Sequence, residues 1–311
     1  MRLRIFTQEN ADTAGSTNNN ERVIAMLKRI ITSIVALAIF IPFLIFSDTW
    51  FFPVAMSICS LAGCYEMLGC IGQRKNVFIV IPIYICAVLA PLSMRYAYII
   101  NRPSELLTFA LSIFLVMTIY IFSVSVFDNK RIHVTDTGLI ISSSAYIIAA
   151  FTSIVYIHDT VHLGKYIYLL VFLGAWISDS FAYFTGRLLG KHKLIPSVSP
   201  KKTVEGAIGG IVFCVLTTVG FGFVIEQFIV QSDSVRANYL VLAISGIFIS
   251  IVSQTGDLIM SLIKRHYGIK DYGWIFPGHG GFLDRFDSVM AVSVILEFIC
   301  TYFNLFANVM V

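Results

Sequence analysis

Nine long apolar runs constrain this chain more than any other feature of its sequence. A helix needs about 20 mostly apolar residues to cross a bilayer, and each run is close to that length. Charged residues make up only 13% of the 311 residues, whereas a soluble domain has roughly 25%. We therefore predict an all-α, polytopic integral membrane protein with about nine transmembrane helices. The expected helices span 30–47, 51–70, 77–94, 106–127, 138–157, 166–186, 206–229, 237–260 and 287–307.

The positions of the basic residues predict how these helices are oriented. Cytoplasmic loops of membrane proteins are enriched in Lys and Arg. With a cytoplasmic N-terminus, 18 of the 22 Lys and Arg residues fall inside, and only Arg95, Arg102, Lys165 and Arg236 fall outside. We predict a plasma membrane of the bacterial inner-membrane type, with the N-terminus inside and the C-terminus outside. The net charge of +4 is too small to indicate a nucleic-acid partner.

Three parts of the chain differ in composition. Residues 1–29 are polar, and we interpret them as a cytoplasmic N-terminal tail. Residues 30–165 form the N-terminal transmembrane helices, which have short loops and few charges expected to be buried, with Glu66 as the main exception. In residues 166–311, polar residues gather toward the predicted cytoplasmic side. We therefore expect any catalytic region in this C-terminal part.

A first polar cluster lies in the expected helix 166–186 and just after it. Asp179, Tyr183 and Arg187 are spaced by four residues, which places them on one helical face. A carboxylate inside a bilayer costs at least a few kcal/mol, so it normally has a partner or a function. Two interpretations stay open: Asp179 belongs to a substrate site, or a neighbouring helix satisfies it.

A second cluster, Ser199–Gly206, precedes the expected helix 206–229. Pro200 excludes a continuous helix here, so we predict a cytoplasmic loop. Ser199, Lys201 and Lys202 stand beside the free N–H groups of a helix start, a combination that suits an anion. The alternative is that the lysines face lipid headgroups.

The third cluster is the densest and runs from Ser253 to Asp287. Its carboxylates offer the hard oxygen ligands that Mg²⁺ prefers, and its cations suit phosphate oxygens. Such a set is typical of phosphoryl or nucleotidyl transfer, where positioning and charge neutralisation dominate. An ordinary charged loop with structural ion pairs is the alternative. The carboxylates are Asp257, Asp284 and Asp287, and the cations are Lys264, Arg265, His279 and Arg285.

The run from Ser261 to Asp287 resembles the motif of the phosphatidate cytidylyltransferase family, the CDP-diacylglycerol synthases. The motif is Ser-x-apolar-Lys-Arg, four residues, Lys-Asp, and later Pro-x-His-Gly-Gly-apolar-x-Asp-Arg-apolar-Asp. This chain fits it at every fixed position. The clusters at 176–187 and 199–206 resemble the family as well, so the likeness covers roughly 174–287 by motif and the rest by architecture.

The resemblance implies that CTP and phosphatidate react to give CDP-diacylglycerol and pyrophosphate. It implies Mg²⁺ as cofactor, with K⁺ open as a second ion, and a site on the cytoplasmic side of the bilayer. Open alternatives are a CTP-dependent transferase for another lipid phosphate, or a transporter, and a homodimer is an open alternative to a monomer. The predicted residues are, for metal, Asp257 and Asp284; for catalysis, Lys264, Arg265, His279, Arg285 and Asp287; and for substrate, Asp179, Ser199, Lys201, Lys202, Ser261, Lys270 and Asp271.

Overall fold

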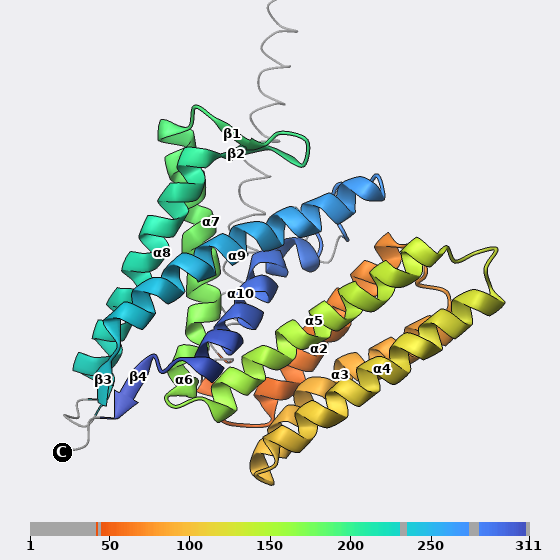
Figure 1. The fold of residues 1–311 in the computed structure, drawn as a ribbon, viewed down its shortest axis with the longest axis horizontal. Coiled ribbons are helices and arrows are strands. Elements are labelled where there is room, and N and C mark those ends of the chain that lie inside the picture. The colour runs from red at the N-terminus through yellow and green to blue at the C-terminus, as the bar shows by residue number, and fades with distance from the viewer. Residues whose placement is uncertain (1–41, 43–44, 231–234, 274–279, 309–311) are drawn as a thin grey trace, which may run out of the picture.

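Long helices dominate the computed structural model, which describes residues 42, 45–230, 235–273 and 280–308. Two small two-stranded sheets accompany them (Figure 1). The tail 1–29 and most of the expected helix 30–47 lie outside the described residues. The helices are α2 (Phe51–Cys70), α3 (Val77–Ile99), α4 (Pro103–Phe127), α5 (Val134–Thr160), α6 (Gly164–Ile167), α7 (Leu169–Leu189), α8 (Val204–Val224), the π-helix η1 (Ile225–Val230), α9 (Tyr239–His266) and α10 (Leu283–Tyr302). The strands are β1 (Lys193–Ile195), β2 (Ser199–Thr203), β3 (Val235–Ala237) and β4 (Phe306–Asn308).

Seven helical segments among the described residues are long and apolar enough to cross a membrane. They correspond to the second through eighth expected helices, so the chain is an all-α, polytopic integral membrane protein. Helix α10 corresponds to the ninth, but it is not among the seven because its 20 residues include Asp284, Arg285, Asp287 and Glu297. The total of nine helices stays a prediction.

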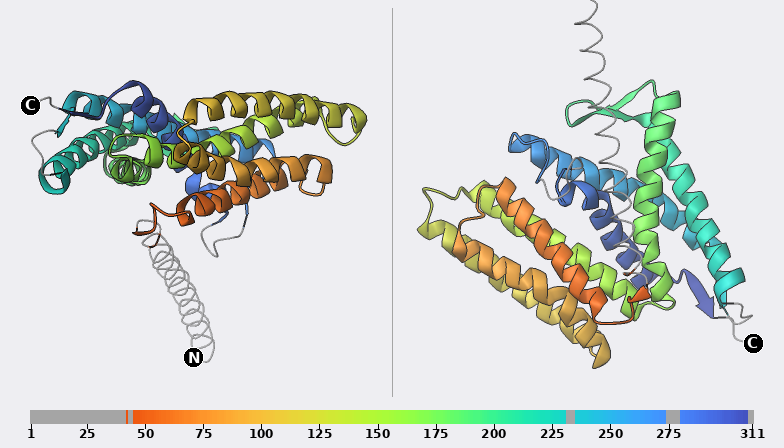
Figure 2. Two further views of the ribbon diagram at one scale, coloured as in Figure 1. Left: turned by 90° about the horizontal axis from the view of Figure 1, so that it is seen from below. Right: turned by 180° about the vertical axis from the view of Figure 1, so that it is seen from behind.

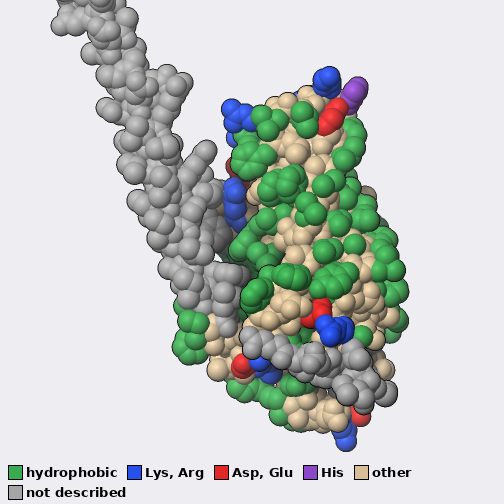
Figure 3. Space-filling view, turned by 90° about the vertical axis from the view of Figure 1, so that its left-hand side faces the viewer, with side chains coloured by type: hydrophobic (Ala, Val, Ile, Leu, Met, Phe, Trp, Pro, Cys, Tyr) green, Lys and Arg blue, Asp and Glu red, His purple; other side chains and the backbone are tan. Residues whose placement is uncertain are grey.

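The outer surface of the helices is apolar, as lipid contact requires. On α8, the exposed side chains Ile208, Val212 and Leu216 recur every four residues and form one stripe. Hydrophobic side chains cover the middle of the face in Figure 3, and charged side chains gather near its two ends. Exposed apolar patches of this extent are rare on soluble monomers, so the surface agrees with a membrane location.

The helices form two groups that meet along α5 and α10. Helices α2, α3 and α5 pack against one another, and α4 packs on α3 and α5. Helices α7, α8, α9 and α10 form the second group (Figures 1 and 2). The contact between α5 and α10 joins them, so the N-terminal helices lie directly beside the start of α10.

Helices α7 and α8 approach closely because two glycines leave room. A Cβ atom at Gly206 would lie 2.5 Å from the carbonyl oxygen of Ala182, and one at Gly210 would lie 2.9 Å from that of Ser178. Small residues four apart allow such packing in membranes. Thr203 caps α8, because its side chain accepts a 3.2 Å hydrogen bond from the N–H of Gly206. This packing fixes the end of β2 against α7.

The segment before α8 is a β-hairpin rather than the expected loop. Strands β1 and β2 are antiparallel, with Lys193 opposite Thr203 and Ile195 opposite Ser199. Pro200 lies inside β2, where it is tolerated because each strand of a two-stranded sheet has a free edge. The hairpin holds Lys201 and Lys202 in an extended conformation.

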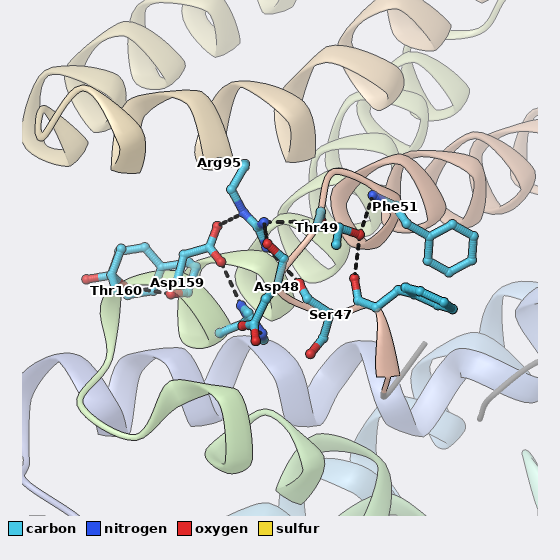
Figure 4. A network of polar contacts seen from close by, with 10 residues as sticks. Ser47, Asp48, Thr49, Phe51, Arg95, Asp159 and Thr160 are labelled. Carbon is cyan, nitrogen blue, oxygen red and sulfur yellow. Dashed lines mark hydrogen bonds and ion pairs between the residues drawn. The ribbon is translucent and has the colours of Figure 1, made fainter. Parts of the chain in front are cut away.

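At the other end of the molecule, a buried ion pair fixes the N-terminal helices (Figure 4). The Nε atom of Arg95 in α3 lies 2.5 Å from Asp159 Oδ2 in α5. The two terminal nitrogens of the guanidinium donate to the carbonyl oxygens of Ser47, Asp48 and Thr49. Breaking a buried pair of this kind typically costs about 3–5 kcal/mol, so the network anchors the entry to α2.

Candidate active site

Asp257 of α9 is held by a lysine from the hairpin. The Nζ atom of Lys202 lies 2.7 Å from Asp257 Oδ2, and it also donates a 3.2 Å hydrogen bond to the carbonyl oxygen of Gln254. Ser261, one turn along α9, donates a 3.3 Å hydrogen bond to Asp257 Oδ1. The side chain of Asp257 is 31% exposed and that of Lys202 23%. The second and third polar clusters of the sequence therefore meet at an accessible carboxylate.

Asp284, in the first turn of α10, is bound by groups from three segments. The Nζ atom of Lys264 in α9 lies 2.6 Å from Asp284 Oδ1. The backbone N–H groups of Tyr272 and Gly281 each donate a 2.9 Å hydrogen bond to Asp284 Oδ2. A negative charge is favourable at a helix N-terminus. Asp284 thus ties the end of α9 to the start of α10 and holds a cation beside it.

Three helices bring the carboxyl groups of Asp179, Asp257 and Asp287 into mutual electrostatic interaction. Helices α9 and α10 approach closely at Gly256, where a Cβ atom would lie 2.5 Å from that of Ala291. Asp287 is buried, and its Oδ1 accepts a 2.8 Å hydrogen bond from the N–H of Ser288. The first and third clusters therefore also meet.

The donor chemistry of this region suits a hard divalent cation. Asp257 and Asp284 offer carboxylate oxygens, and Lys202 and Lys264 both attract Asp257. Within the described ranges, no group of three or more His, Cys, Asp and Glu side chains is arranged to hold a metal ion. Mg²⁺ usually binds through one or two carboxylates plus substrate phosphates. Asp257 and Asp284, each beside a lysine ammonium, are consistent with that mode.

Tyr272 organises the segment that follows α9. Its hydroxyl donates a 2.9 Å hydrogen bond to the carbonyl oxygen of Met260, and burial raises the pKa of Tyr272, so the hydroxyl stays a donor. The Nζ atom of Lys264 lies 5.5 Å from the centre of its ring, within the range of a cation–π interaction. The tyrosine therefore supports both Lys264 and the backbone that binds Asp284.

The remaining predicted residues that the structure describes differ in burial. Asp271 is near Asp284, because a Cβ atom at Gly280 would lie 3.4 Å from Asp271 Oδ1 and 3.2 Å from Asp284 Oδ2. Ser199 is half-buried in β2. His279 lies outside the described residues. The exposed members are Lys201, Arg265, Lys270, Asp271 and Arg285.

Three residues at this site have no role predicted from the sequence. Gln254 and Tyr272 lie within the third cluster but carry no charge. Glu66 contacts the start of α10 from 216 and 217 residues away in sequence. The one signal available was its isolation as a charge in an otherwise apolar run.

Comparison with known proteins connects this geometry to a chemistry. The model of the cytidylyltransferase family matches residues 27–303 of the chain. Relatives named phosphatidate cytidylyltransferase are similar over 98% of their own length and 88% of this chain. The Staphylococcus haemolyticus relative is 32% identical over 273 residues, that of Staphylococcus saprophyticus 34% over 272, and that of Staphylococcus aureus strain COL 32% over 276.

Proposed function

Because the chain belongs to the cytidylyltransferase family, we infer that its function is that of a phosphatidate cytidylyltransferase. The observation that carries this inference is the match to relatives of that name, which are 32% to 34% identical over 88% of this chain. The protein is a nucleotidyltransferase of phospholipid biosynthesis, and CTP and phosphatidate are its substrates. The family match favours this function over the transporter alternative.

The reaction requires alignment more than proton transfer. An oxygen of the phosphatidate phosphate forms a bond to the α-phosphorus of CTP, while the bond from that phosphorus to the α–β bridging oxygen breaks. Pyrophosphate leaves with the electron pair of the broken bond, and CDP-diacylglycerol remains. The attacking phosphate is already ionised near neutral pH, so the site needs positioned charges rather than a strong base.

The lysines that contact Asp257 and Asp284 are the main proposed phosphate-binding groups. Lys202 and Lys264 are each held within 2.7 Å of a carboxylate oxygen, which fixes their ammonium groups in one region. Fixed cations stabilise the charge that develops on phosphate oxygens in the transition state. The exposed residues Arg265 and Arg285 would add to this charge from the rim of the site.

The other predicted residues complete the proposed site. Asp287, beside Asp257, would shape the negative side of the centre, and His279 keeps its predicted catalytic role. The proposed substrate contacts are Asp179, Ser199, Lys201, Lys202, Ser261, Lys270 and Asp271.

Asp257 and Asp284 are the residues we propose to hold Mg²⁺, with K⁺ as a second ion. When bound, the divalent ion supplies positive charge that neutralises the phosphates of CTP. Support comes from the oxygen-only donor set and from the two lysine contacts, which mark both carboxylates as cation-binding.

We also propose that the site faces the cytoplasm, which is where CTP is made. The hairpin β1–β2 and the junction of α9 with α10 lie toward the same end of the molecule (Figure 1). Among the described residues, that end carries most of the Lys and Arg side chains, as cytoplasmic loops do. The lipid bilayer and a homodimer remain the other predicted partners.

A direct assay tests the function and the lipid acceptor together. Purified protein receives radiolabelled CTP, Mg²⁺ and one acceptor: phosphatidate, a polyprenyl phosphate or none. We expect labelled lipid and pyrophosphate with phosphatidate only. Labelled lipid formed only from the polyprenyl phosphate would instead favour the alternative acceptor.

A further inference from the structure

A buried carboxylate from the N-terminal helices caps the helix that begins at the active site. Glu66 lies in α2 and is 1% exposed. Its Oε1 atom accepts a 2.9 Å hydrogen bond from the backbone N–H of Phe282, and its Oε2 atom accepts one of 2.9 Å from the N–H of Leu283. These N–H groups belong to the first turn of α10, where Phe282 provides no side-chain cap of its own. Glu66 supplies that cap from another helix.

Glu66 and Asp284 bind three consecutive N–H groups of one turn. The N–H of Gly281 donates to Asp284 Oδ2, while those of Phe282 and Leu283 donate to Glu66. Unsatisfied N–H groups at a helix start are costly when buried, so both carboxylates are needed to complete the turn. The conformation that presents Asp284 to Lys264 therefore depends on a residue outside the motif.

Two glycines of the third cluster make room for this carboxylate. A Cβ atom at Gly273 would lie 2.2 Å from Glu66 Oε1, and one at Gly281 would lie 2.6 Å from Glu66 Oε2. Real Cβ atoms do not approach this closely, so a side chain at Gly273 would displace Glu66, and one at Gly281 would displace both Glu66 and the backbone nitrogen of Gly273, 2.5 Å away. The absence of side chains at Gly273 and Gly281 thus leaves the space that the carboxylate of Glu66 occupies.

We propose that Glu66 is a positioning residue for the cytidylyl transfer, which acts by fixing the backbone turn that carries Asp284. This proposal rests on the proposed function and extends it to the N-terminal helices. Glu66 itself would touch neither substrate. It acts through Asp284 and Lys264, so its loss affects turnover more than substrate affinity.

The test compares Glu66→Gln and Glu66→Ala with Glu297→Gln. Glu297 is a matched control, because it is another glutamate inside the helices and its carboxylate contacts Ser153 rather than the site. We expect Glu66→Ala to lower kcat roughly 10- to 100-fold, the scale of a small misplacement of reacting groups. The KM for CTP and for phosphatidate should change less than about threefold, because no substrate contact is lost. Glu66→Gln keeps one acceptor oxygen and should fall between the parent and Glu66→Ala.

A second measurement follows the turn itself. Hydrogen exchange of the peptide containing residues 281–284 should be faster in Glu66→Ala than in the parent and unchanged in Glu297→Gln. As a single change, Gly273→Ala should lower kcat. In the Glu66→Ala background it should cause little further loss of kcat, since both changes remove the same contact. Parent-like kcat in Glu66→Ala would overturn the proposal. So would equal loss of kcat in Glu66→Ala and Glu297→Gln, or unchanged exchange of the turn.

The two inferences fail in different ways. If the parent protein forms no CDP-diacylglycerol, the proposed function is wrong, whatever the exchange data show. If the parent is active and Glu66→Ala is equally active, only the role of Glu66 is wrong.

Discussion

Asp257 and Asp284 lie on neighbouring helices, and each contacts one lysine. We predict that Asp257→Asn and Asp284→Asn each lower turnover on the order of 10²-fold, as loss of other preorganised charge-stabilising groups does. Asn keeps the shape of the side chain and removes the charge that would bind Mg²⁺. The measurement is CDP-diacylglycerol formation across a Mg²⁺ titration.

The control for this pair is Glu105→Gln. Glu105 is exposed and pairs with Arg102 at the opposite end of the molecule, so its loss should leave turnover and the Mg²⁺ dependence unchanged. Near-normal turnover of Asp257→Asn or Asp284→Asn at ordinary Mg²⁺ would remove that residue from the metal site.

The two adjacent lysines of β2 should behave differently, although their sequence context is the same. Lys202 contacts Asp257 and Gln254, whereas Lys201 is exposed. We expect Lys202→Ala to raise the KM for CTP or phosphatidate about tenfold, the scale of one lost charged hydrogen bond. Lys201→Ala should raise it less than about threefold, because exposed charges interact weakly. Steady-state kinetics in which each substrate is varied in turn measure these KM values. Equal increases in KM for the two variants would show that the contact of Lys202 with Asp257 does not contribute to substrate binding.

At the scale of helices, the contact between α7 and α8 requires glycine at position 206 of α8 but not at position 220. Gly206→Ala places a Cβ atom 2.5 Å from the backbone oxygen of Ala182, whereas nothing lies within 4 Å of a Cβ atom at Gly220. We predict that Gly206→Ala destabilises the protein by about 1–3 kcal/mol, as overpacking does. Gly220→Ala should be neutral or slightly stabilising, since Ala favours helices by up to about 1 kcal/mol over Gly. Thermal denaturation in detergent measures both, and equal midpoints would contradict the packing argument.

The sequence predicted the helices well because hydropathy acts locally. Each apolar run long enough to span a bilayer and lying within the described residues became a helix, with ends shifted by up to six residues. The hairpin β1–β2 was not predicted, because its polar residues carry no strand periodicity and Pro200 indicated a loop.

The parts of the candidate site whose residues are close in sequence were predictable. The contacts between residues that are far apart in sequence were not. The spacing of Asp257, Ser261 and Lys264 placed them on one face of α9. The bonds from Lys202 to Asp257 and from Glu66 to the start of α10 join residues 55 and 216 positions apart. No local pattern encodes such pairs, since helix packing decides them.

For the whole molecule, the connections between helices lie at two opposite ends, and the connections rich in Lys and Arg lie at the same end. The α2–α3 and α4–α5 connections lie together, as the hydrogen bond from Gln73 to the carbonyl oxygen of Arg131 indicates. They lie toward the same end as the hairpin, whereas the α3–α4 connection and the β3–β4 sheet lie toward the other (Figures 1 and 2). The basic connections therefore lie toward one end of the molecule, and from the positive-inside rule we predict that this end faces the cytoplasm.

We predict that reporter fusions at Asn129, Ser197 and Gly273 are cytoplasmic and that fusions at Arg102 and Arg236 are external. The physical reason is that α4, α8 and α9 each run between the two ends and are long and apolar enough to cross a bilayer. A phosphatase–fluorescent protein pair, one active outside and the other inside, gives opposite signals at the two ends. A reversal of all five signals would invert the orientation and leave the fold intact. A cytoplasmic signal at Arg236 together with one at Ser197 would mean that α8 does not span the membrane, and the proposed arrangement of helices around the site would then be wrong.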